Sequence, residues 1–276
     1  MHVLARPARL ADRLHVDVLG IVGLVGLLVL WWAITVLGLV PPLFLPSPGD
    51  VADAIASNFF ASPYLENYHL GNTGFAGNLG YTIGNVMLAL ATACVLGLTL
   101  GLISARIQRV RAVFDPIVLT VGTIPVLVTA PFFLIWFGTE RAPQVALLVL
   151  YDTTIVYMFA QRAVGNLDPI YQAAARTLGA SPLRMLFQVF LIGTLPEVFG
   201  GLRIALAGAW GLEAIAELLG STAGIGKVIQ ALASATDVPT IMAAVLSLAA
   251  VAVGFDALVA GLFGTITRWR PARQSS

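Results

Sequence analysis

Charged residues are scarce in this chain: they make up 11% of its 276 residues, whereas soluble globular domains contain about a quarter. Hydrophobic residues make up 58%. So few charges exclude an ordinary water-soluble domain and indicate an integral membrane protein. Cysteine is represented by Cys94 alone, which excludes a disulfide within the chain. The histidines, His2, His15 and His69, have no Cys or carboxylate neighbours at ligand spacings, so no metal site is predicted.

Long apolar runs recur along the sequence. A helix needs about 20 apolar residues to cross roughly 30 Å of hydrocarbon. The sequence therefore predicts an all-α integral membrane fold with about six transmembrane helices, at residues 18–40, 79–104, 112–137, 143–163, 197–219 and 240–266. Residues 18–266 form one transmembrane domain, between an N-terminal segment, 1–17, and a tail, 267–276. Glu213, Glu217 and several glycines interrupt the fifth run, which we expect to be broken or re-entrant.

Arginines gather in alternate connections between these runs. Because positive residues resist translocation, the connections that carry them face the cytoplasm. We therefore expect both termini and the connection 164–196 on the cytoplasmic side. The opposite connections hold only Arg141 and Lys227 as basic residues, whereas the cytoplasmic ones hold Arg6, Arg9, Arg13, Arg106, Arg109, Arg111, Arg162, Arg176, Arg184, Arg268, Arg270 and Arg273.

The stretch 167–196 is a polar island between two apolar runs. Asp168 is a good helix N-cap, and a short helix can run from there to Leu178. Gly179 can supply the left-handed residue that ends it, and Ser181 repeats the start signal. The pattern predicts a helix, a glycine elbow and a second helix, a shape that suits a groove on a cytoplasmic partner.

The segment A-A-A-R-T-L-G-A, residues 173–180, resembles the core of the cytoplasmic E-A-A-x-x-x-G loop of permease subunits in binding-protein-dependent ABC importers. The segments L-P-S-P-G-D-V (45–51), P-F-F-L-I-W-F-G (131–138) and G-L-R-I-A-L-A-G-A-W (201–210) resemble the nitrate/sulfonate/taurine branch of that family. The resemblance covers roughly residues 20–265. This chain departs from the motif at two positions. Ala173 stands where the motif has glutamate, and Ile192 stands about where the motif has the first of two later prolines, although Pro196 keeps the second.

The resemblance implies a type I importer-like permease in the bacterial inner membrane, surrounded by lipid and with no nucleic-acid partner. It would work as a homodimer with two cytoplasmic ATP-binding subunits and an external solute-binding protein. ATP and Mg would be bound by the partner ATPase, so this chain holds no cofactor and is not an enzyme. The solute would be a small anion such as a sulfonate, taurine or nitrate. By resemblance, the ATPase-coupling residues are Ala173, Ala174, Ala175, Arg176, Leu178, Gly179, Ala180 and Arg184.

Carboxylates within the apolar runs are costly and are usually kept for a pathway or a partner. Glu213 and Glu217 lie four apart on one helix face, where they either line or gate the solute pathway or brace the helix. Two carboxylates would repel an anion, so we expect Glu217 to brace. Asp152 and Asp256 are expected to pair with Arg203, Lys227 or backbone groups, or to lie near an interface.

Proline and small residues mark further positions in the spans. Pro125 and Pro131 should kink the third span and are candidate gating residues. Ala93, Gly97 and Gly101 recur every four residues, so we expect them to pack closely against another helix.

Two external connections carry further patterns. Residues 220–228, G-S-T-A-G-I-G-K-V, resemble a phosphate-binding loop but lack its first glycine and the hydroxyl residue after Lys227. We expect a glycine-rich turn and then a helix near 228–235. Residues 51–60 predict a short amphipathic helix. The loop 61–77 either contacts a delivery protein or is a passive surface loop.

Two other functions would use the same acidic pair. In a proton-coupled secondary carrier, Glu213 and Glu217 would exchange protons and no ATPase would be needed. In an intramembrane enzyme they would be catalytic, but enzymes of that kind need His or Asn partners, and no His lies in any span.

Overall fold

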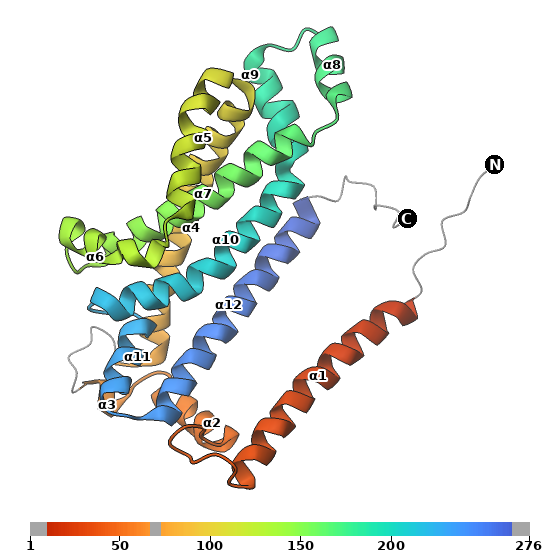
Figure 1. The fold of residues 1–276 in the computed structure, drawn as a ribbon. Helices are drawn as coiled ribbons and strands as arrows, with labels where there is room; N and C mark the ends of the chain where they lie inside the picture. Colours follow the sequence, from red (N-terminus) through yellow and green to blue (C-terminus); the bar gives the residue numbers. More distant parts are fainter. Residues whose placement is uncertain (1–9, 67–72, 267–276) are drawn as a thin grey trace.

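The computed structural model describes residues 10–66 and 73–266, and every regular element in those residues is a helix (Figure 1). The all-α prediction is therefore confirmed. Residues 1–9 and 267–276 of the expected terminal segments, and 67–72 of the expected external loop, lie outside the described residues. The helices are α1 (Leu10–Val36), α2 (Pro48–Asn58), α3 (Pro63–Glu66), α4 (Phe75–Arg106), α5 (Gln108–Thr123), α6 (Val126–Phe137), α7 (Arg141–Gly165), α8 (Pro169–Thr177), α9 (Pro182–Arg184), a π-helical segment (Met185–Phe190), α10 (Leu191–Gly220), α11 (Ile225–Ser234) and α12 (Val238–Ile266).

The described residues hold five or six candidate membrane spans, in line with the predicted number. Five helical segments are long and apolar enough to cross a membrane on their own, and α5 with α6, bent by 100° where they meet, make a sixth when the pair is counted as one span. The bent pair returns the chain to the end of the bundle where α4 begins, because Arg141, the first residue of α7, bonds to Asn85 of α4. We call the two ends of the bundle the α8 end and the α11 end (Figure 1).

The third span is broken rather than kinked. Ile124 and Pro125 both have extended backbone, with ψ of 126° and 104°. Proline disfavours helical backbone at the residue before it and cannot donate an N–H to the preceding turn. Pro131 lies inside α6 and marks no break, so of the two predicted kinks only the one at Pro125 is seen, and as a full change of direction.

The expectation of a broken or re-entrant fifth span is wrong. α10 is continuous from Leu191 to Gly220. Two of its glycines, Gly201 and Gly208, pack against α7. A Cβ on Gly201 would lie 2.5 Å from Cγ of Phe159, and one on Gly208 would overlap Tyr151, so only glycine lets the two helices approach this closely.

The centre of the bundle is the contact of α4 with α7. Ala93, Gly97 and Gly101 are buried there, as predicted. A Cβ on Gly97 would lie 2.7 Å from Cβ of Val156, and one on Gly101 would lie 2.8 Å from Cβ of Ala160. The small-residue stripe therefore sets the distance between α4 and α7.

The helix α1 diverges from α12 and joins the bundle at the α11 end (Figure 1). It begins at Leu10, within the segment 1–17 that we expected outside the membrane. Beside it, α2 confirms the predicted amphipathic helix. Ser47 and Asp50 form a capping box at its start, and Val51 and Ala54 are buried.

Replacing Gly101 by valine should destabilise the bundle. The added side chain meets Ala160 and the Tyr157 carbonyl, and overpacking of this kind costs on the order of 1–3 kcal/mol. We expect a lower midpoint of thermal unfolding for the purified chain in detergent. Gly254→Val in α12 is the matched control, because nothing lies within 4 Å of a Cβ at that position. Equal loss of stability in the two variants would contradict this account of the packing.

Candidate functional site

The α8 end of the bundle carries a projection formed by α8, α9 and the turn between them, residues 169–184 (Figure 1). Asp168 caps α8 by accepting the Ile170 N–H at 2.9 Å. The helix ends in a Schellman motif, in which the N–H groups of Gly179 and Ala180 donate to carbonyls of α8, and Gly179 has φ of +70°. Ser181 then caps α9 by accepting the Arg184 N–H. The predicted helix, glycine elbow and second helix are confirmed.

The α8–α9 projection exposes apolar side chains among its polar ones. No residue of α8 or α9 is buried, and Leu178 at the elbow is 86% exposed. Of the predicted coupling residues, Ala175 and Ala180 are partly buried and the others, Ala173, Ala174, Arg176, Leu178, Gly179 and Arg184, are exposed. The sequence reasoning missed three exposed apolar neighbours: Ile170, Tyr171 and Leu183.

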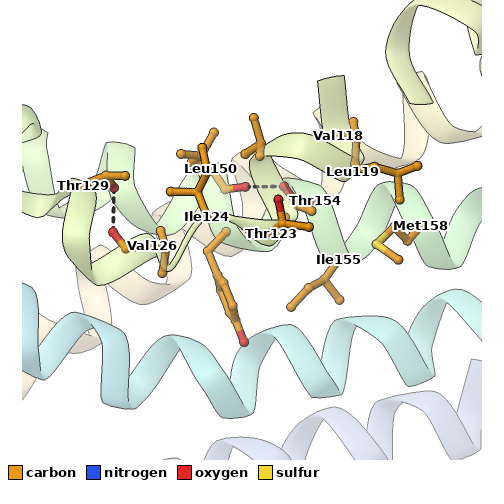
Figure 2. Close-up of a pocket in the computed structure, with 13 residues that line it drawn as sticks. Val118, Leu119, Thr123, Ile124, Val126, Thr129, Leu150, Thr154, Ile155 and Met158 are labelled. Atoms are coloured by element: carbon orange, nitrogen blue, oxygen red, sulfur yellow. Dashed lines mark hydrogen bonds between the residues drawn. The ribbon is translucent and has the colours of Figure 1, made fainter. Parts of the chain in front are cut away.

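A cavity of about 380 Å³ lies where α5 bends into α6, and it faces α7 (Figure 2). We call it the bend cavity. None of its 13 lining residues is charged. The hydroxyls of Thr129 and Thr154 in its wall donate to carbonyls of their own helices, at 2.6 Å and 2.9 Å (Figure 2).

A second cavity, of about 820 Å³, adjoins the first and extends between α5 and α7 to the start of α8. We call it the mouth cavity, and the two cavities together the groove. Val118, Leu119 and Met158 line both. The two cavities of the groove therefore adjoin, one at the bend between α5 and α6 and the other reaching the α8 end of the bundle.

The mouth cavity holds a polar cluster that joins α5 to α7. One oxygen of Asp115 accepts from Tyr157 Oη and Gln161 Nε2, each at 2.6 Å, and the other accepts from Arg111 Nε at 3.0 Å. Arg162 lies on the same wall, 3.6 Å from Glu197. The carboxylate of Asp115 is thus occupied by donors from three residues.

Glu217 binds the start of α11. Its Oε2 accepts the Gly226 N–H at 2.8 Å, and its Oε1 accepts from Thr82 Oγ1 at 2.7 Å. Thr82 in turn accepts the Ile225 N–H, and Asn78 accepts the Gly224 N–H. A carboxylate is favourable at a helix N-terminus, where free N–H groups point outward. The glycine-rich stretch that resembles a phosphate loop therefore binds acceptors of its own chain.

Glu213 lies one turn earlier, within hydrogen-bonding reach of Glu217. Its Oε1 accepts from Asn85 Nδ2 at 2.6 Å, and Asn85 Oδ1 accepts from Arg141 Nε. Glu213 and Glu217 are fully buried, and neither lines the groove. The structure thus places the acidic pair between α4, α7, α10 and α11, away from both cavities.

The other two carboxylates within the spans differ in their partners. Asp256 forms a bidentate ion pair with Arg203, at 2.6 Å and 2.7 Å, as expected. Asp152 is fully buried, and neither of its oxygens has a hydrogen-bond partner in the described part of the chain. The expected pairing of Asp152 is therefore wrong. Lys227 donates to Gln230 rather than to a carboxylate.

The sequence model of the binding-protein-dependent transport system inner membrane component matches residues 97–269. This chain belongs to that family. It is therefore a multi-pass permease component of the inner membrane, and ATP hydrolysis lies outside it.

Individual relatives extend the match over most of the chain. The taurine transport system permease protein TauC of Escherichia coli is 30% identical over 88% of this chain and 86% of its own length. The formylaminopyrimidine transport permease protein ThiX of Halalkalibacterium halodurans is 26% identical over 88% of this chain and 93% of its own length. A solved bacterial ABC transporter that imports alginate shares the fold, with a TM-score of 0.62 and 16% identity over 94% of this chain and all of that one.

The partners of the acidic pair in this permease were missed by the sequence reasoning. Asn78, Thr82 and Asn85 follow one another at spacings of four and three, so they share one face of α4 inside an apolar run. Such a polar face in a membrane helix is a signal that a second polar element packs against it.

Glu217→Gln should loosen the start of α11. The amide keeps one acceptor and turns an NH₂ group toward Thr82 or Gly226, so one buried donor loses its partner, at a cost of about 1–3 kcal/mol. We expect faster hydrogen exchange of the amides at 224–226. Glu197→Gln, on the same helix at the α8 end, serves as the control. Unchanged exchange in Glu217→Gln would show that the carboxylate does not hold α11.

Proposed function

We propose that this permease carries a small sulfonate-like anion, such as taurine, and that the groove is its share of the solute route. The groove is the observation that carries the proposal, because its two cavities share Val118, Leu119 and Met158 and reach the α8 end. The 30% identity with a taurine permease supports the choice of solute.

The lining of the groove suits an anion. The bend cavity has no charged wall residue that would repel or trap a charged solute. In the mouth cavity the charged residues are Arg111, Arg162 and Asp115, and the Asp115 carboxylate is occupied by Tyr157, Gln161 and Arg111. Arg111 and Arg162 each pair with an acid, Asp115 and Glu197, so an anion would meet guanidinium N–H groups at the mouth without a free carboxylate beside them.

The orientation that we propose follows from the arginines. Arg106, Arg109, Arg111, Arg162, Arg176 and Arg184 all lie at or near the α8 end, so that end faces the cytoplasm and both termini lie there with it. The groove then opens inward, and the α11 end receives the external solute-binding protein.

The α8–α9 projection is the proposed contact with the ATPase. Ala173 offers no carboxylate for an ion pair, and the exposed apolar side chains Leu178 and Leu183 would bind instead. Each of two permease copies would dock one ATP-binding subunit, which holds ATP and Mg. Movement of the docked subunits would rock the bundle around the groove.

The acidic pair has a bracing role in this proposal. Glu217 holds α11 and Glu213 binds Asn85, and neither reaches the groove. A proton-coupled carrier would need a titrating carboxylate on its solute route, so this arrangement disfavours that alternative. We expect Glu217→Gln to leave the order of solute preference unchanged.

Met158→Trp tests the groove. The indole would fill the junction of the two cavities, so we expect most taurine uptake to be lost in cells that express the complete transporter. Stimulation of ATP hydrolysis by the binding protein should persist, because Met158 lies outside the projection. Val253→Trp, on an exposed face of α12, is the control for adding an indole. Full uptake by Met158→Trp would place the route elsewhere.

Gly179→Val tests the ATPase contact. A branched residue resists φ of +70°, at a cost on the order of 1–2 kcal/mol, so the elbow should distort. We expect loss of ATPase copurification and of stimulated hydrolysis. Gly200→Val is the control, because a Cβ there meets nothing within 4 Å and its backbone is helical. Normal coupling in Gly179→Val would exclude the projection as the docking element.

A further inference from the structure

Arg141 begins α7 at the α11 end of the bundle, and its side chain is exposed. It lies about two and a half turns before Leu150, the first α7 residue of the groove. Its contacts are with α4 rather than with α5 or α6. Arg141 is therefore separate from the solute route proposed above.

The guanidinium of Arg141 is held in a fixed position. Its Nε donates to Asn85 Oδ1, and its Cζ lies 5.0 Å above the ring of Tyr81. Gly84 leaves the space for Nη2, because a Cβ on Gly84 would lie only 2.8 Å from that nitrogen. Three residues of one face of α4 thus fix the plane of the group.

The neighbours of Asn85 reinforce this arrangement. Asn85 Nδ2 donates to the buried carboxylate of Glu213 at 2.6 Å, so the amide that receives Arg141 is itself held. Tyr81 donates its hydroxyl to Gln144 Oε1 at 3.2 Å. The side chains that position the guanidinium cannot rotate without breaking other buried contacts.

Nη1 and Nη2, at the outer edge of the guanidinium, have no hydrogen-bond acceptor in the described part of the chain. Nε is used by Asn85, and no described carboxylate lies within 4.0 Å of Arg141. Arg111, Arg162 and Arg203, in contrast, each pair with an acid. Lys227, the other basic residue near this end, already donates to Gln230.

We propose that Arg141 is a preorganised receptor for an oxyanion, a sulfonate or phosphate group that accepts two hydrogen bonds from Nη1 and Nη2. Guanidinium groups bind such groups through two parallel N–H···O bonds, and a group fixed in advance loses little entropy on binding. The oxyanion comes either from a free anion at this face of the membrane or from a lipid headgroup.

The experiment measures the thermal unfolding midpoint of the full chain in detergent at constant ionic strength. In one arm chloride is replaced by methanesulfonate, and in the other phosphatidylglycerol is compared with phosphatidylcholine. Arg141→Gln removes the donors, and Gly84→Ala keeps the charge but displaces Nη2. The controls are Lys227→Gln, which removes a nearby charge, and Gly80→Ala, whose Cβ meets nothing within 4 Å.

We expect a concentration-dependent rise of the midpoint in at least one arm. The apparent affinity should be at least roughly tenfold weaker in Arg141→Gln and Gly84→Ala than in the controls. A response to methanesulfonate identifies a free anion, and a response to phosphatidylglycerol alone identifies the headgroup. No rise in either arm, or equal weakening in Lys227→Gln and Gly80→Ala, would overturn the proposal.

Discussion

The hydrocarbon core of a membrane offers no hydrogen bonds, so a buried polar group in this bundle is stabilised only where the protein supplies a partner. The contacts between α4, α7, α10 and α11 supply several such partners, whereas Asp152 and one oxygen of Glu213 have none in the described part of the chain. Glu217 and Thr82 satisfy N–H groups at the start of α11, Asn85 links Glu213 to Arg141, and Asp115 links α5 to α7. Gly97 and Gly101 let α4 and α7 approach each other closely.

Local features of the fold could be read from the sequence. The helix at Pro169–Thr177, its Asp168 cap and the left-handed Gly179 depend on residues within a dozen positions of one another, and all are present. The spans follow from runs of apolar residues, which need no knowledge of neighbours. The pairing of Asp256 with Arg203 could be predicted because few basic residues lie within the spans.

Features that depend on distant segments could not be read in this way. Thr82 and Glu217 are 135 positions apart, so nothing near Glu217 in the sequence indicates its partner. Pro125 and Pro131 have the same backbone chemistry, yet only Pro125 lies at a break between two helices, and nothing local in the sequence distinguishes them. The glycines of α10 suggested a weak helix, whereas the helix is continuous, and Gly201 and Gly208 leave room for Phe159 and Tyr151 of α7.

The helical segment from Pro182 to Gly220 has a mechanical consequence. It runs for 39 residues without a break, roughly 55–60 Å at 1.5 Å per residue. One end is part of the α8–α9 projection. The other end carries Glu217, whose carboxylate accepts a hydrogen bond from the start of α11. Its π-helical turn, Met185–Phe190, and Pro196 both lie near the projection, and beyond Pro196 no proline or π-helical turn interrupts the helix. A tilt of the part beyond Pro196 therefore reaches the α11 end of the bundle, and α11 moves with it.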